Sequence, residues 1–258
     1  MSQYRRPIIF KTFFRGSRAA YEGIRVAFAD AGVRKAYLRV MLIMLALTLS
    51  IDVFGLWGLF AWVDPSGAEQ EWMGVILWAV RILGGLLILV MGPLVAILTI
   101  NVFFPFFNEP LFMAGLRAQD PERADRVAAG PGMAISAAAG IALLRLVRFV
   151  ALTIMFVLIG LIPVVGGIVA TIGEGWLLAR TVSWELMDPY FDRLDLGWAE
   201  QKRFVDQYRD ALLGFGLPLG LMLAIPLVGP LMFGWAQGAV GTFLLREIPP
   251  HPREFGQS

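Results

Sequence analysis

Two cationic residues, Arg34 and Lys35, stand at the expected start of a helix, just behind Asp30, Gly32 and Val33. The amide groups at a helix start lack partners within the helix and favour an anion, all the more beside cations. The stretch Gly32, Val33, Arg34 and Lys35 therefore predicts a binding site for an oxyanion substrate. The alternative is that the cations only anchor a cytoplasmic segment at the membrane surface, which requires no ligand.

Asp52 and Arg81 are charged residues inside apolar segments that are long enough to cross a membrane. An unpaired charge at such a depth costs about 3 kcal/mol or more, so each residue needs a partner or a route to the surface. The two segments would run antiparallel, which predicts an intramembrane ion pair between Asp52 and Arg81 with a structural role. The alternative is that Arg81 extends its side chain to the nearer membrane surface.

Four further polar residues are candidates for a pore or for ion coupling. Asn108 and Glu109 follow the second apolar segment, where they could line a permeation path or simply terminate the helix. Arg145 and Arg148 lie one turn apart and therefore on one side of a later helix. The two arginines could attract anions to the cytoplasmic mouth of a pore, or they could contact lipid headgroups.

Asp188, Asp192 and Arg193 form a compact charged group around Pro189. This pattern predicts a local turn held by salt bridges, with an ion-coupling site as the alternative. The group belongs to 174–210, a segment with eight acidic and five basic residues that we expect to form cytoplasmic helices at the molecular surface.

The sequence lacks the residues that most catalytic and metal sites require. It has no cysteine, and its single histidine, His251, lies in a proline-rich tail. The phosphate-binding pattern Gly-x-x-x-x-Gly-Lys-Ser/Thr is also absent, so we expect no ATP hydrolysis by this chain. We therefore expect a protein that is not an enzyme, with no catalytic residues, no metal, no cofactor and no nucleic-acid partner.

The composition indicates that lipid is the solvent for much of the chain. Of 258 residues, 58% are hydrophobic and 16% are charged, and the mean hydropathy is +0.69. Charges are absent from 82–107, 149–173 and 211–245. Each of these runs can cross or deeply enter a hydrocarbon core of roughly 30 Å. The sequence therefore predicts an all-α integral membrane protein, folded as a single membrane domain over 1–258.

The N-terminal segment 1–39 predicts an amphipathic helix lying in the membrane interface, because bulky apolar and basic residues each recur in it at helical spacing. The alternative is a helix that packs on a protein core. Residues 40–107 predict two spanning helices, and 108–148 predict a cytoplasmic segment. Nine Lys and Arg residues in 1–39, against none in the loop 64–71, indicate a cytoplasmic N-terminus.

Two similar motifs, Ile162-Pro163-Val164-Val165-Gly166 and Ile225-Pro226-Leu227-Val228-Gly229, lie in the middle of uncharged runs. Proline and glycine together break a helix and allow a tight turn. The uncharged arm leading to each motif extends only about 21–23 Å at the helical rise. We therefore predict two re-entrant, hemi-penetrating hairpins, 149–173 and 211–245, that enter from the cytoplasmic side, with two kinked full spans as the alternative. The tail, 246–258, follows the second hairpin.

Several of these stretches resemble the CysZ sulfate permease family and the related etoposide-induced membrane proteins. The order of the motifs over residues 15–245 carries the resemblance. Lys35 stands where the family commonly has a second arginine, and lysine lacks the planar fork that suits an oxyanion. The matching stretches are Gly32-Val33-Arg34-Lys35, Pro105-Phe106-Phe107-Asn108-Glu109, Ile162-Pro163-Val164-Val165-Gly166, Asp188-Pro189-Tyr190-Phe191-Asp192-Arg193 and Gly214-Phe215-Gly216.

This resemblance implies a multi-pass protein of the bacterial cytoplasmic (inner) membrane that takes up sulfate for cysteine biosynthesis. It also implies a homo-oligomer built from two spanning helices and hemi-penetrating hairpins, with sulfate or a similar oxyanion and membrane lipids as its partners. The alternative function is a membrane scaffold or lipid-interacting protein without transport, which the basic amphipathic N-terminus and the wedge-like hairpins also fit.

Overall fold

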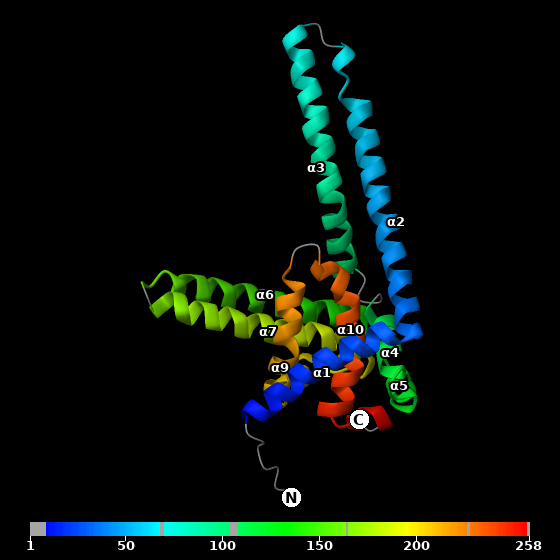
Figure 1. The fold of residues 1–258 in the computed structure, drawn as a ribbon, viewed down its shortest axis with the longest axis vertical. Coiled ribbons are helices and arrows are strands. Elements are labelled where there is room, and N and C mark those ends of the chain that lie inside the picture. The colour runs from blue at the N-terminus through cyan, green and yellow to red at the C-terminus, as the bar shows by residue number, and fades with distance from the viewer. Residues whose placement is uncertain (1–8, 68–69, 104–107, 164, 226–227, 257–258) are drawn as a thin grey trace, which may run out of the picture. The chain divides into compact units, whose positions relative to one another are not determined.

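The chain is all helical in the part that the structure describes, a computed structural model covering residues 9–67, 70–103, 108–163, 165–225 and 228–256 (Figure 1). This confirms the predicted helical class. Within the described ranges, α2, α3 over Glu71–Gly92 and α6 are the helices long and apolar enough to cross a membrane. In chain order the elements are α1 (Ile9–Ala29), α2 (Ala31–Trp62), η1 (Pro65–Gly67), α3 (Glu71–Phe103), α4 (Asn108–Arg117), α5 (Pro121–Ala128), α6 (Ile135–Gly160), α7 (Val165–Arg193), α8 (Trp198–Gln207), α9 (Arg209–Leu223), α10 (Val228–Glu247) and η3 (Pro252–Phe255).

The helices form two compact units. The smaller unit is Tyr37–Phe107, and the larger one combines Met1–Ala36 with Asn108–Ser258. The smaller unit contains most of α2 and all of α3, whereas the larger unit contains α1 and α4 to α10. The single membrane domain over 1–258 stays a prediction.

In the smaller unit, α2 and α3 present apolar side chains to the outside. Phe54, Trp57 and Leu83 are all more than half exposed, at 70%, 69% and 67%. Close packing between the two helices uses glycine, as where Gly84 faces the side chain of Leu59. Such a surface would be unstable in water and suits a lipid environment.

In the larger unit, the first Ile-Pro motif forms a hairpin in which α6 and α7 lie side by side (Figure 1). The turn includes Leu161, Ile162 and Pro163, while Val164 lies outside the described residues. The predicted bounds 149–173 are too narrow, because the helices of this hairpin begin at the start of α6 and continue to the end of α7.

The arms of this hairpin are longer than the uncharged run suggested. The stretch before Phe149 is rich in alanine and leucine, which favour a helix, and Arg145 and Arg148 continue the helix rather than ending it. With 26 residues, α6 measures about 39 Å at the helical rise. The argument from short arms is therefore wrong for the first hairpin.

The second Ile-Pro motif connects α9 to α10, and its Pro226 and Leu227 lie outside the described residues. Here the short leading arm is as predicted, because α9 has 15 residues. Much of this hairpin is buried in the core of the larger unit, where the rings of Phe215 and Phe243 lie 4.5 Å apart. Its apolar tip is exposed, with Ile225 at 50%.

The helix α1 has features of both structures considered for the N-terminal segment, a helix in the membrane interface and a helix that packs on a protein core. Its small residues face α9 and α10, where Gly16 meets Ala211 and Gly23 meets Ala239. The aromatic residues of its other face remain exposed, including Phe10 at 74%, Phe14 at 65% and Tyr21 at 67%. The helix therefore packs on protein and also presents an aromatic face outward.

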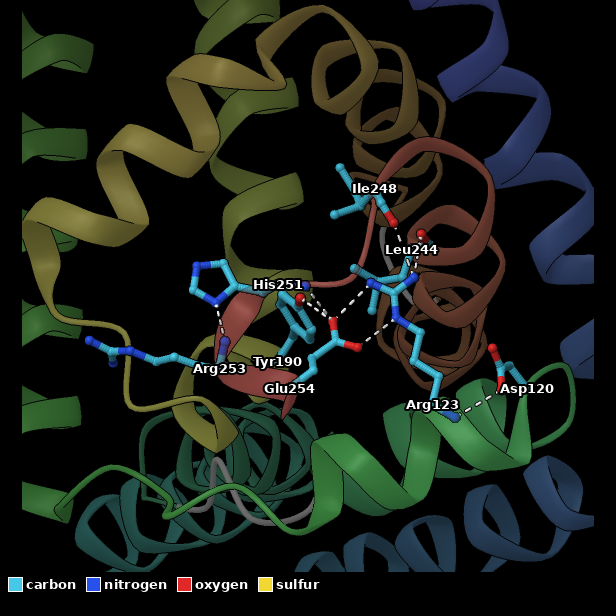
Figure 2. A network of polar contacts seen from close by, with 8 residues as sticks. All are labelled: Asp120, Arg123, Tyr190, Leu244, Ile248, His251, Arg253 and Glu254. Atoms are coloured by element: carbon cyan, nitrogen blue, oxygen red, sulfur yellow. Dashed lines mark hydrogen bonds and ion pairs between the residues drawn. The ribbon is translucent and has the colours of Figure 1, made fainter. Parts of the chain in front are cut away.

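The C-terminal tail is tied to the larger unit by a buried ion pair between Arg123 of α5 and Glu254 of η3 (Figure 2). The two side chains are 2% and 0% exposed, and two arginine nitrogens lie 3.0 and 3.1 Å from the carboxylate oxygens. The hydroxyl of Tyr190 donates to the same carboxylate at 2.7 Å. Arg123 also donates to the carbonyls of Leu244 and Ile248 at 2.9 and 3.0 Å, which fixes the end of α10.

The segment 174–210 is core rather than surface, so the prediction of surface helices is wrong. Trp184, Tyr190, Phe191 and Phe204 of α7 and α8 are all buried. Their rings face the interior, while Arg180, Asp188 and Arg193 of α7 pair with residues of other helices. The aromatic residues scattered among the charges were therefore the signal for a core-forming pair of helices.

Candidate functional site

The start of α2 carries the predicted oxyanion-binding residues. Asp30 precedes the helix, and its Oδ1 atom accepts a hydrogen bond of 2.8 Å from the amide of Val33. This arrangement is an ordinary side-chain cap. It places a carboxylate of the protein at the amide groups where an external anion was expected, and the side chain of Val33 is fully buried.

The two cations of this stretch are available to a ligand. Arg34 and Lys35 are both exposed, and neither forms an ion pair with another described residue. Gly32 is exposed as well, and a Cβ atom there would lie 3.1 Å from Oδ1 of Asp30. The stretch thus offers two cationic side chains beside one capping carboxylate, rather than a row of free amides.

In the smaller unit, Asp52 and Arg81 do not form the predicted ion pair. Arg81 donates to the carbonyls of Phe60, at 2.9 Å, and Val63, at the end of α2. Asp52 lies opposite Gly92 instead, and its Oδ1 atom has no hydrogen-bond partner among the described residues. The register between α2 and α3 therefore separates the two charges along the helices, and the arginine satisfies backbone groups that the end of a helix leaves open.

A charged cluster in the larger unit joins residues that are far apart in the sequence. Arg145 of α6 makes a two-pronged contact with the carboxylate of Asp188 on α7. Arg193, also on α7, donates to Glu109 of α4 at 2.8 Å. The local salt-bridged turn predicted around Pro189 is therefore wrong, because the residue lies within α7 and the charges pair with other helices.

Asp192 is a carboxyl of this cluster whose pKa is raised by its surroundings. Burial, together with the neighbouring carboxylates of Asp188 and Glu109, raises the pKa of Asp192 from its ordinary value of 3.8 to about 7, and Arg145 opposes the shift. Near neutral pH this group is therefore divided between its protonated and ionised forms. The cluster combines Arg145 and Arg193 with the carboxyls of Glu109, Asp188 and Asp192, and Glu185 also interacts with Arg145 and Asp188, so protonation of Asp192 removes one of several negative charges.

Asn108 and Glu109 lie at the start of α4. Glu109 lies in the first turn, where its negative charge is favoured by the helix dipole, and it also holds Arg193. The preceding residues of the motif, 105–107, lie outside the described residues.

Arg148 does not join the charged cluster but lines a pocket between α6, α7 and α8. Arg145 and Arg180 also line this pocket, together with Trp184 and Trp198. The two tryptophan rings are stacked with centroids 5.2 Å apart. Arg180 donates to Asp206 at 2.7 Å and lies over the Trp184 ring at 5.6 Å.

The sequence analysis missed Arg180 and its aromatic neighbours. A signal was available, because Trp176, Arg180 and Trp184 recur every four residues and therefore lie along one side of α7. The guanidinium group of Arg180 lies 5.6 Å from the ring centroid of Trp176 and 5.6 Å from that of Trp184. Within the described ranges, no group of three His, Asp and Glu side chains could hold a metal ion.

The helices and their exposed apolar surfaces define a helical membrane protein with charged sites at helix starts and between helices. A comparison with protein families gives a match over residues 22–233 to the family described as sulfate transporter CysZ/etoposide-induced protein 2.4. The chain belongs to this family, and the resemblance seen in its motifs is confirmed. No curated protein sequence matches the chain.

Proposed function

We propose that this chain is a permease for sulfate or a similar oxyanion in the bacterial cytoplasmic membrane, where it supplies sulfur for cysteine biosynthesis. The observation that carries the proposal is the family match over residues 22–233, which includes both the start of α2 and the charged cluster. The apolar helices α2, α3 and α6 support a transport role, since they are long enough to cross a membrane.

The proposed substrate site consists of Gly32, Val33, Arg34 and Lys35. A dianion leaving water needs donors that replace its hydration, and the exposed Arg34 and Lys35 supply them beside the start of a helix. The negative charge of Asp30 repels the same anion. Binding would therefore rely on the two side chains, with the capping carboxylate limiting affinity so that the substrate can leave again.

In this proposal the charged cluster is the coupling element. Glu109 and Arg145 belong to it, and Asn108 lies beside it in the chain. Protonation of Asp192 near neutral pH removes one negative charge from the cluster, which would ease the passage of an anion. We therefore expect uptake of the anion to be linked to proton transfer.

The proposed topology has a cytoplasmic N-terminus, α1 in the membrane interface, spanning helices α2 and α3, and two hairpins that enter from the cytoplasmic side in a homo-oligomer. The exposed aromatic face of α1 and the exposed apolar tip at Ile225 support it. Cysteines introduced at the exposed residues Asp125 and Asp195 should both react from the cytoplasmic side only. Labelling of either position from outside intact cells would contradict this topology.

The test of function is uptake of radiolabelled sulfate into liposomes that contain the purified protein. Arg34→Ala should weaken sulfate binding roughly tenfold to hundredfold, because charge-assisted hydrogen bonds contribute about 1.5–3 kcal/mol. Arg39→Ala is the matched control, since Arg39 is a nearby exposed cation on the same helix and should leave affinity nearly unchanged. Binding of anionic lipid without any sulfate flux would favour the scaffold function instead.

A further inference from the structure

We propose that the pocket between α6, α7 and α8, called the arginine pocket below, binds the phosphate headgroup of an anionic phospholipid. The pocket is lined by Arg145, Arg148 and Arg180, together with Trp184 and Trp198. None of these residues belongs to the proposed substrate site at the start of α2. Arg145 also belongs to the charged cluster, but the proposal rests on Arg148, to which the proposed transport gives no role.

The three arginines of the arginine pocket differ in whether an acidic side chain neutralises them. Arg145 is neutralised by its two-pronged contact with Asp188, and Arg180 is paired with Asp206 at 2.7 Å. Arg148 forms no ion pair or hydrogen bond with any other described residue, although it is partly buried. A partly buried guanidinium without an acidic partner is stabilised by an anion, and a phosphate oxygen suits its planar fork.

The other walls of the pocket are apolar. Phe149, Leu152 and Leu177 line it beside the arginines. A free inorganic anion in this place would lose part of its water against surfaces that cannot hydrogen-bond. A phospholipid avoids this penalty, since its phosphate can meet Arg148 while the first part of an acyl chain lies along the apolar walls.

The surroundings of Arg148 also indicate a lipid. The neighbours of Arg148 on α6, Leu146, Val147 and Val150, are 57%, 59% and 45% exposed, so apolar surface that suits lipid adjoins the pocket. Tryptophans are enriched at the interface between membrane and water, where lipid phosphates lie, and the partly exposed Trp198 lines this pocket. Basic pockets between membrane helices are known sites for anionic headgroups.

The experiment compares phosphatidylglycerol, phosphatidylcholine and sodium sulfate as additives to the full-length protein in detergent. Lipid bound to the intact protein is counted by native mass spectrometry, and the thermal midpoint is measured in parallel. We expect phosphatidylglycerol to bind and to raise the midpoint, whereas phosphatidylcholine, which has no net charge, should bind at least tenfold more weakly.

Arg148→Gln should lower the affinity for phosphatidylglycerol roughly tenfold or more, and Arg148→Lys should lose less because it keeps the charge. The matched control is Arg203→Gln, which removes an exposed arginine of α8 and should leave lipid binding unchanged. Equal binding by wild-type protein and Arg148→Gln would overturn the proposal. Sulfate that competes with the lipid and loses its own affinity in Arg148→Gln would identify the pocket as a site for free anions and would also overturn it.

Discussion

The two Ile-Pro hairpins share nearly the same turn motif but have opposite surroundings. In the first, α6 and α7 expose long rows of apolar side chains, as at Leu158, which is 60% exposed. In the second, α9 packs against α1 and α7, and α10 packs against α1 and α4. A shared motif therefore specifies where the chain turns, while the residues of the arms determine whether the hairpin faces lipid or protein.

Small residues account for much of this difference. On α9, Gly214 lies against the backbone of Phe13 and Gly216 against that of Ala179, so neighbouring helices approach closely. On α7, Gly167 and Gly175 have open space where a Cβ atom would be. Glycine in the second hairpin is needed for packing, whereas at these two positions of the first it is not.

The largest expected effect concerns the arginine that holds each hairpin. Arg123 fixes the end of α10 through a fully buried pair with Glu254, whereas Arg145 joins α6 to α7 through Asp188 with side chains that are 15% and 26% exposed. Arg123→Met should reduce the free energy of unfolding by about 3–5 kcal/mol, because it leaves a buried charge without a partner. Arg145→Met should cost less, since water or lipid headgroups can reach the remaining carboxylate.

Denaturation in detergent, followed by circular dichroism, measures both variants. The double variant Arg123→Met, Glu254→Leu should recover much of the loss, because no buried charge remains. A loss in Arg145→Met as large as that in Arg123→Met would show that the two hairpins are held alike and would remove this part of the comparison.

The second prediction exchanges glycines between the two environments. Gly214→Val should destabilise the protein by about 3 kcal/mol, since the new side chain would overlap the carbonyl of Phe13 and force α1 away from α9. Gly167→Ala is the control and should raise stability by up to about 1 kcal/mol, because alanine favours a helix and the position is open. Thermal midpoints of both variants are measured in the same detergent. An unchanged midpoint in Gly214→Val would show that the protein does not need the close contact between α1 and α9.

The sequence predicts the positions of helices and turns more reliably than it predicts which helices pack together. Uncharged runs and the Ile-Pro motifs are local signals, so the hairpin positions were predictable, whereas the start of α6 was not, because Arg145 and Arg148 interrupt the run without interrupting the helix. The helix α5 was also missed, although Asp120 caps it and Pro121 begins it. The motif Asp-Pro followed by charged residues is compatible with a loop as well as a helix start.

The candidate site was harder to predict because its contacts join distant parts of the chain. Asp188 and Arg193 were seen as a charged group, but their partners Arg145 and Glu109 belong to other helices. Spacing reveals only neighbours on one helix. The pairing of Asp52 with Arg81 failed for the same reason, since depth in the membrane was estimated without the register between α2 and α3.

The smallest expected effect is a dependence of stability on pH, which concerns Asp192 near the end of the first hairpin. Its pKa is raised to about 7 in the folded protein, so between its ordinary value of 3.8 and about 7 the folded state holds a proton that the unfolded chain has released. The contribution of this group is therefore complete below about pH 4 and is lost as the pH rises toward 7. The slope of the free energy of unfolding against pH cannot exceed about 1.4 kcal/mol per pH unit for one proton, and partial exposure of the side chain reduces it.

Asp192→Asn removes the titrating group, so the thermal midpoint of this variant should fall less than that of the wild type between pH 5 and pH 7. Glu122→Gln, which changes an exposed carboxyl of α5, serves as the control and should keep the wild-type slope. Parallel curves for the wild type and Asp192→Asn would mean that burial at the end of α7 does not hold this carboxyl in its protonated form, and the coupling role proposed for the cluster would lose its titrating group.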